Sequence, residues 1–184
     1  MTSPEYARAN VERENGCKVA VTYAPALVLS REIEAGRTAD LGILGSGVMD
    51  QMVKRGNIVT ASVRVLTRNG IGVGVIKGAP KPDLSSVETF KRALLNAKSV
   101  AYTTEGASGI YFASLIEKLG IAGQIKAKAK TRSGGLIAEF VVSGDAEIAV
   151  QQIPEIMAVA GVDYAGPLPA EIQNISVGTA GIFA

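Results

Sequence analysis

The sequence of 184 residues contains no histidine, no tryptophan and a single cysteine, Cys17. The lack of histidine excludes histidine-based catalytic triads, histidine–zinc sites and imidazole acid–base chemistry. A lone cysteine forms neither an internal disulfide nor a CxxC metal site. Aromatic residues make up only 5% of the chain, which argues against aromatic platforms that stack bases or sugars. We therefore expect a protein without a metal site, a cofactor or an evident catalytic set.

Charge and hydrophobicity narrow the function classes further. The net charge of +2 is too small to indicate binding to nucleic acid or to an acidic membrane. The hydrophobic content of 47% is typical of a soluble globular protein. No apolar run approaches the roughly 18 residues of a membrane-spanning helix, so we expect no membrane insertion. The opening segment MTSPEYARANVEREN lacks the apolar core of a secretory signal, and Ser3 and Pro4 predict a helix that Gly16 ends.

Strand-like and helix-like patterns alternate along the chain, which indicates an α/β protein with largely parallel sheets. The expected strands are 18–23, 40–44, 58–66, 73–77, 99–102, 124–130, 147–151, 162–166 and 175–184. Between them, helices are expected to begin near residues 26, 46, 85, 108, 134 and 154. The glycine-rich passage 67–74 predicts a hinge between a first lobe (1–70 with 172–184) and a second lobe (71–171).

Residues 100–119, VAYTTEGASGIYFASLIEKL, are the most informative segment. An apolar strand leads through a Gly/Ser turn into a helix with an apolar stripe. Ser108 is the expected N-cap of this helix, and Gly106 and Gly109 are expected to let the backbone approach a ligand. Because the first amides of a helix lack internal partners, the turn predicts a site for a small anion. A purely structural corner gives the same pattern and is the alternative.

A run of basic residues, IKAKAKTR at 125–132, has two interpretations. It places Lys126, Lys128, Lys130 and Arg132 on one face of an expected strand. We interpret it as a solvent-exposed face that discourages edge pairing rather than as a phosphate-binding stripe.

The order of several motifs resembles that of type II periplasmic solute-binding proteins, in the molybdate-binding-protein-like branch. The segments that carry the resemblance are VTYAPALVLSREIEAGRTADLGIL, GIGVGVIKGAPKPD, YTTEGASGIYFASLIEKLGI, SGDAEIAVQQIPEI and VDYAGPLPAEIQN. The resemblance implies two α/β lobes that close on a small anion, with an ABC transporter permease as partner. It also implies ligand-binding positions in loops at helix starts: Ala24, Ala26, Ser46, Thr104, Gly106, Ala107, Ser108, Gly109, Gly134, Gln151 and Gln152. Arg68, at the hinge, would add a positive charge for a carboxylate.

This chain departs from the family pattern in two ways. YAPA lacks the hydroxyls that molybdate binders place after their second strand, and Gln151 and Gln152 stand where they place a tyrosine. These departures favour a carboxylate or another small polar anion over a tetrahedral oxyanion. The resemblance also implies that a first strand and C-terminal helices are missing. We therefore expect an open sheet edge that self-association covers, giving a homodimer or higher homo-oligomer.

Three other functions stay open. Some relatives of this fold isomerise small tricarboxylates, for which Glu105 or Tyr102 would be the acid–base group and Arg68 the clamp. The effector domains of LysR-type regulators share the fold, although the chain lacks their DNA-binding helix-turn-helix. A last alternative is that the chain folds and assembles without binding any ligand. Its location is open between the periplasm, which the resemblance implies, and the cytoplasm, which the missing signal favours.

Overall fold

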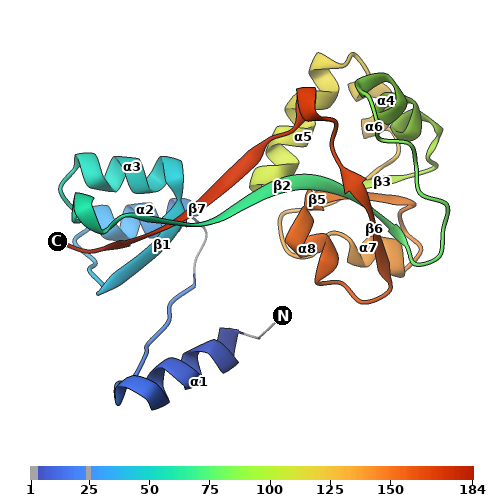
Figure 1. Cartoon of the computed structure of the whole chain (residues 1–184). Coiled ribbons are helices and arrows are strands. Elements are labelled where there is room, and N and C mark those ends of the chain that lie inside the picture. The colour runs from blue at the N-terminus through green and yellow to red at the C-terminus, as the bar shows by residue number, and fades with distance from the viewer. Residues whose placement is uncertain (1–3, 24–25) are drawn as a thin grey trace.

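The computed structural model of the protein describes residues 4–23 and 26–184. Two α/β bodies are joined by two long strands, β2 (Arg64–Ile76) and β7 (Ile175–Ile182), which run antiparallel side by side (Figure 1). This is the two-part α/β fold that the sequence predicts, and the residue boundaries given for the lobes stay a prediction. The prediction of largely parallel sheets was wrong, because every strand pair that β2 or β7 forms is antiparallel. In the described part of the chain, no helix has both the length and the apolar character needed to cross a bilayer.

The first body is a small sheet in the order β1-β7-β2, with β1 (Leu41–Gly45) at its edge. Helices α2 (Ala26–Glu34) and α3 (Ser46–Lys54) cover one face of it. The buried residues of this body are Ile33, Leu44, Met49, Met52 and Ile58. Leu44 points at the helices, whereas Leu41 and Ile43 are 54% and 64% exposed. Strand β1 is therefore buried on one face only, because its alternate residues point to the uncovered face.

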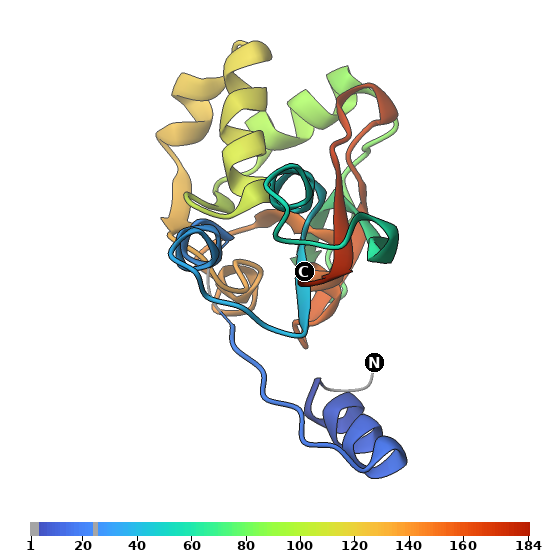
Figure 2. The same ribbon diagram turned by 90° about the vertical axis from the view of Figure 1, so that its left-hand side faces the viewer.

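Helix α1 (Pro4–Asn15) precedes this body and lies apart from the sheet in both perpendicular views (Figure 2). It ends before Gly16, as predicted, where the backbone turns with a φ of +63°. The strand predicted at 18–23 does not form. The Val19 amide donates to the side-chain Oε1 of Glu12 at 2.8 Å rather than to a neighbouring strand, and Tyr23 is exposed. The alternating pattern is present, but a strand also needs an edge to pair with.

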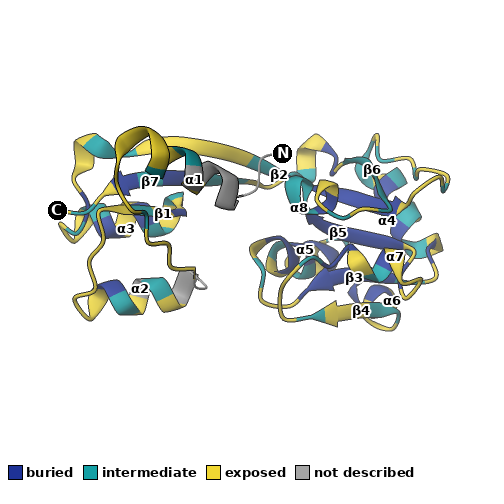
Figure 3. Cartoon of the chain, turned by 90° about the horizontal axis from the view of Figure 1, so that it is seen from below, coloured by how far each residue is buried: buried dark blue, intermediate teal, exposed yellow. Residues whose placement is uncertain are grey.

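The second body holds the remaining strands, in the order β2-β5-β3-β4, with β6 on the other side of β2. These strands are β3 (Val100–Thr103), β4 (Ala129–Arg132), β5 (Ile148–Gln152) and β6 (Val162–Pro167). Figure 3 shows that the buried residues of this sheet concentrate in β3, β5 and the second half of β2, whereas the first half of β2 is exposed. Strands β3, β4 and β5 are parallel, and β2 is antiparallel to β5.

Helices cover both faces of the second sheet. On one face lie α4 (Val87–Asn96), α5 (Ala107–Lys118) and α6 (Ala122–Lys126), whose buried side chains include Phe90, Leu94, Phe112, Ile116 and Ile125. The other face carries α7 (Glu139–Val142) and α8 (Ile153–Met157). The apolar stripe predicted for 100–119 is confirmed, because Phe112, Leu115 and Ile116 are buried with Tyr111 and Leu119 packed beside them.

Two further predictions need correction. Residues 124–130 do not form one strand, because Ala122 and Ile125 are spaced as a helix and turn together into the core, so α6 precedes the short β4. The glycine-rich passage lies inside β2 rather than between two strands. A Cβ atom at Gly72 would lie 2.7 Å from the Tyr164 ring, and one at Gly74 would lie 2.9 Å from Ile156. These glycines therefore allow β6 and α8 to pack closely on β2.

The helix starts are displaced from the predicted caps. Gly45 and Gly106, rather than Ser46 and Ser108, are the N-caps of α3 and α5, and neither helix has a side-chain cap. Helix α4, expected to begin near residue 85, begins with a capping box formed by Ser86 and Thr89. In this box the Thr89 amide donates to Ser86 Oγ at 3.2 Å, and the Ser86 amide donates to Thr89 Oγ1 at 3.0 Å. Sequence spacing locates these helix starts to within one or two residues.

Candidate ligand-binding site

The predicted binding residues of the second body lie at one edge of its sheet. Because β3, β4 and β5 are parallel, their last residues Thr103, Arg132 and Gln152 end at the same side. Each strand then leads into a loop or helix start that was predicted to bind the ligand. The Thr104 amide donates to the Arg132 carbonyl at 2.9 Å, which ties the first two loops together.

The first turn of α5 packs against the end of β3. A Cβ atom at Gly109 would lie 1.7 Å from the Thr103 carbonyl oxygen, and one at Gly106 would lie 2.5 Å from Thr103 Oγ1. The two glycines therefore let the first turn of the helix approach the strand closely. Ser108 is buried as the second residue of the helix, and Ala107 is exposed as the first. Thr103 Oγ1 is buried and has no hydrogen-bond partner in the described structure.

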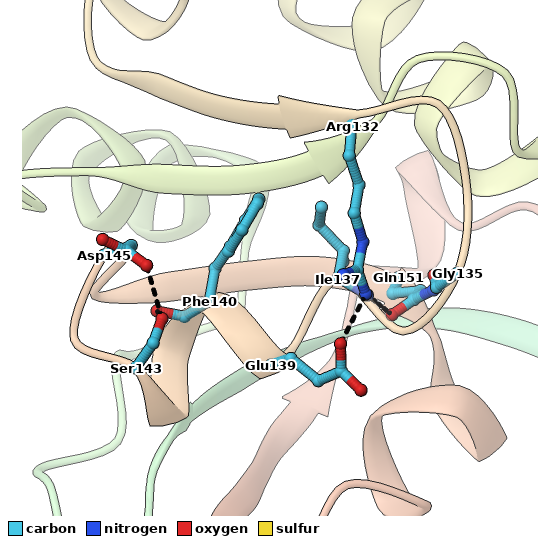
Figure 4. A network of polar contacts seen from close by, with 8 residues as sticks. All are labelled: Arg132, Gly135, Ile137, Glu139, Phe140, Ser143, Asp145 and Gln151. Atoms are coloured by element: carbon cyan, nitrogen blue, oxygen red, sulfur yellow. Dashed lines mark hydrogen bonds and ion pairs between the residues drawn. The ribbon is translucent and has the colours of Figure 1, made fainter.

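Gln151 holds the loop that follows β4. Its side chain is 2% exposed, its Nε2 donates to the Gly135 carbonyl at 2.7 Å, and its Oε1 accepts from the Ile137 amide at 2.9 Å (Figure 4). Gly135 has a φ of +87°, so only glycine enters this turn without strain. Gln151 therefore positions the loop that contains Gly134.

Gln152 points to the strands that join the two bodies. Its Oε1 accepts from Ser176 Oγ at 3.1 Å, and the same hydroxyl lies 3.3 Å from the Asn69 carbonyl. Ser176 belongs to β7 and Asn69 to β2, where the two residues are paired in register. The site edge is thus fastened to the connecting strands one residue from Arg68. Arg68 is exposed and forms no ion pair with the described residues.

The remaining predicted residues belong to the first body. Ser46 is half-buried as the first residue of α3, and Ala26 is the first residue of α2. Ala24 lies outside the described residues. The structure thus brings the residues of the second body to one sheet edge, and places Ser46, Ala26 and Arg68 on other elements.

Arg132 is a polar residue of this edge that sequence reasoning assigned to a solvent-exposed stripe. That assignment was wrong, because its side chain is 31% exposed and its Nη2 donates to Glu139 Oε2 at 2.9 Å. Its guanidinium lies 5.4 Å from the centre of the Phe140 ring. Lys128 is not free in solvent either, because its Nζ donates to the Leu95 carbonyl at 2.6 Å. The signal that would have found Arg132 is its place at the end of a strand parallel to β3.

The residues that could act as an acid–base group differ in how far they are buried. Tyr102 is buried in the core with its ring edge-on to Phe112, at 5.1 Å between ring centres. It therefore faces the helices and not the strand ends. Glu105 is exposed in the loop after β3. Glu155, in α8 directly after β5, is half-buried, and burial raises the pKa of its carboxyl above the usual value.

A groove of the described structure lies away from the predicted binding residues. It measures about 800 Å³ and is lined by the loop 79–83, the end of α4 and residues 141–148. These residues stand at the amino end of β5, on the opposite side of the sheet from the predicted positions. None of the predicted binding residues lines it.

Two α/β bodies joined by paired strands, with loops gathered at the carboxyl ends of parallel strands, define the fold of the type II periplasmic binding proteins. The sequence pattern of the bacterial extracellular solute-binding protein family matches residues 5–183, and the chain belongs to this family. The predicted family resemblance is thereby confirmed.

Solved structures agree with this fold. A substrate-binding domain from Clostridium difficile superposes with a TM-score of 0.71 at 15% identity, covering 96% of this chain and 77% of that one. The periplasmic molybdate-binding protein of Azotobacter vinelandii gives 0.68 at 15% identity, covering 97% and 79%. An aconitate isomerase from a Pseudomonas species is 28% identical over 172 residues, which are 90% of this chain. The chain spans 65% of the length of that relative.

Proposed function

We propose that this solute-binding protein binds a small carboxylate anion for an ABC-type transporter. The observation that carries the proposal is the convergence of three loops at the carboxyl ends of β3, β4 and β5. The first turn of α5 brings amides that the helix itself leaves unpaired, next to the unpartnered hydroxyl of Thr103. The similarity to an aconitate isomerase favours a carboxylate over a tetrahedral oxyanion.

Thermal unfolding in the presence of candidate ligands tests this function. The panel is citrate, cis-aconitate, trans-aconitate and malate, with molybdate and sulfate as tetrahedral controls. A ligand at a hundred times its dissociation constant stabilises the folded protein by about 2.7 kcal/mol. For a chain of this length that corresponds to a rise of roughly 5–11 °C in Tm. We expect such a rise with at least one carboxylate, and no rise with any of them would contradict the proposal.

The similarity to an aconitate isomerase also supports a second candidate function, the isomerisation of a small tricarboxylate. Such a proton shift needs one base beside the bound substrate. Glu105 and Glu155 are the carboxyls nearest in sequence to the ends of β3 and β5, whereas Tyr102 is packed in the core. Incubation of the protein with cis- or trans-aconitate in deuterated water separates the two functions. An isomerase incorporates deuterium and interconverts the isomers, and a receptor leaves both unchanged.

We also propose that the protein self-associates through the uncovered face of the first sheet. Leu41 pairs in register with Ile182, and both are more than half exposed, as is Ile43. Among the described residues, β1 has a partner on one side only. An apolar face next to a free strand edge is the kind of surface that a second copy of the chain covers.

A further inference from the structure

We infer that Arg132 supplies the positive charge that pairs with a carboxylate of the ligand, and that Glu139 occupies this arginine in the ligand-free protein. The inference rests on the proposed function and specifies which group of the site recognises the carboxylate. Arg132 ends β4 in register with Thr103, so its backbone lies at the same sheet edge as the first turn of α5.

Packing holds the guanidinium of Arg132 in place. It lies over the Phe140 ring on one side and against Gly135 on the other, where a Cβ atom would lie 3.4 Å from Nη2. Figure 4 shows the side chain enclosed by the loop that Gln151 fastens. A charge fixed in this way binds an anion without first losing side-chain freedom.

The hydrogen bonds of this guanidinium are incomplete. An arginine has five N–H donors. Among the described residues, the side chain of Arg132 has one hydrogen bond, from Nη2 to Glu139, and its buried Nε has no acceptor. Buried N–H donors are ordinarily paired, so the guanidinium of Arg132 lacks an acceptor at Nε that an arginine with a purely structural role would have.

The planar guanidinium of Arg132 indicates the ligand class. A planar carboxylate accepts two parallel hydrogen bonds from a guanidinium, whereas the ammonium group of a lysine does not offer this pair of donors. Glu139 itself offers such a carboxylate, and its side chain is 56% exposed. The glutamate side of this ion pair is open to solvent, which weakens the pair, so a ligand carboxylate can displace Glu139. Glu139 therefore competes with the ligand, and its removal is expected to strengthen binding.

Calorimetric titration with citrate tests this assignment on the wild-type protein and four variants. Arg132→Met is expected to weaken citrate binding at least tenfold, and Arg132→Lys to weaken it less. Glu139→Gln is expected to strengthen binding several-fold. Lys130→Met is the matched control, because it removes the same charge from an exposed position two residues earlier on β4, and it is expected to change affinity less than twofold.

The possible outcomes separate the two proposals. If wild-type protein binds neither citrate nor the other carboxylates, both the proposed function and this assignment are wrong. If wild-type protein binds citrate and Arg132→Met binds it equally, only the assignment is wrong. Should Arg132→Met fail to fold, Glu139→Gln still decides. Weaker citrate binding by that variant would show that the ion pair supports the loop instead of competing with the ligand.

Discussion

Replacement of Gln151 by leucine removes both hydrogen bonds that fasten the loop after β4 while nearly conserving side-chain volume. The Ile137 amide would be left without its acceptor in a buried position, which costs about 1–3 kcal/mol. The Gly135 carbonyl is in an exposed residue, so water replaces its partner and the loss is nearer 1 kcal/mol. We therefore expect the free energy of unfolding to fall by about 2–4 kcal/mol.

Urea denaturation and thermal unfolding measure this change, and the Tm is expected to fall by roughly 4–16 °C. Gln152→Leu is the matched control. It loses a single bond to Ser176 at a half-buried position and should cost less than about 1.5 kcal/mol. Citrate binding should also weaken in Gln151→Leu, because the loop no longer holds its conformation. Equal stability of the two variants would refute the role given to Gln151.

Three further predictions follow from the same structure. Gly109→Ala is expected to destabilise the protein by at least about 3 kcal/mol, because the added Cβ would overlap the Thr103 carbonyl. The control is Gly123→Ala in α6, where an added Cβ meets open space, so the Tm should stay unchanged or rise. Ile43→Lys is expected to shift the protein from oligomer to monomer in light scattering, and a wild-type monomer at micromolar concentration would contradict the self-association proposal. Burial raises the pKa of Glu155 in the folded protein, so the free energy of unfolding falls as the pH rises from the unfolded-state pKa to the folded-state pKa of this carboxyl. Glu155→Gln should therefore have the Tm of the wild type near pH 4 and a higher Tm near pH 8. Equal Tm values at both pH values would show that burial does not perturb this carboxyl.

The sequence predicts what depends on neighbours along the chain. The apolar stripe of α5 and the end of α1 before Gly16 follow from local spacing, and both form as expected. The predicted strand at 18–23 fails because strand formation depends on a distant edge that the pattern does not specify. The alternation of lysine and alanine at 126–130 is typical of a strand. The spacing of the buried residues Ala122 and Ile125 is that of a helix, and α6 forms there.

Part of the candidate site follows from the sequence as well. The loops around 104–109, 134 and 151–152 are placed at strand ends by the order of elements, and the structure gathers them at one sheet edge. The uses of individual side chains depend on contacts between segments remote in sequence. Gln151 binds the loop at Gly135, and Arg132 reaches Glu139 over Phe140. Neither contact has a signature in residue spacing.

The most direct test of the account is a titration of the isotopically labelled protein with citrate, followed by amide chemical shifts. The account predicts saturable shifts of the amides in the first turn of α5, residues 107–109, and of Gly134 and Gly135. Shifts confined to the groove lined by residues 79–83 and 141–148 would contradict the placement of the site. The absence of any saturable shift with the carboxylates of the panel would contradict carboxylate binding itself.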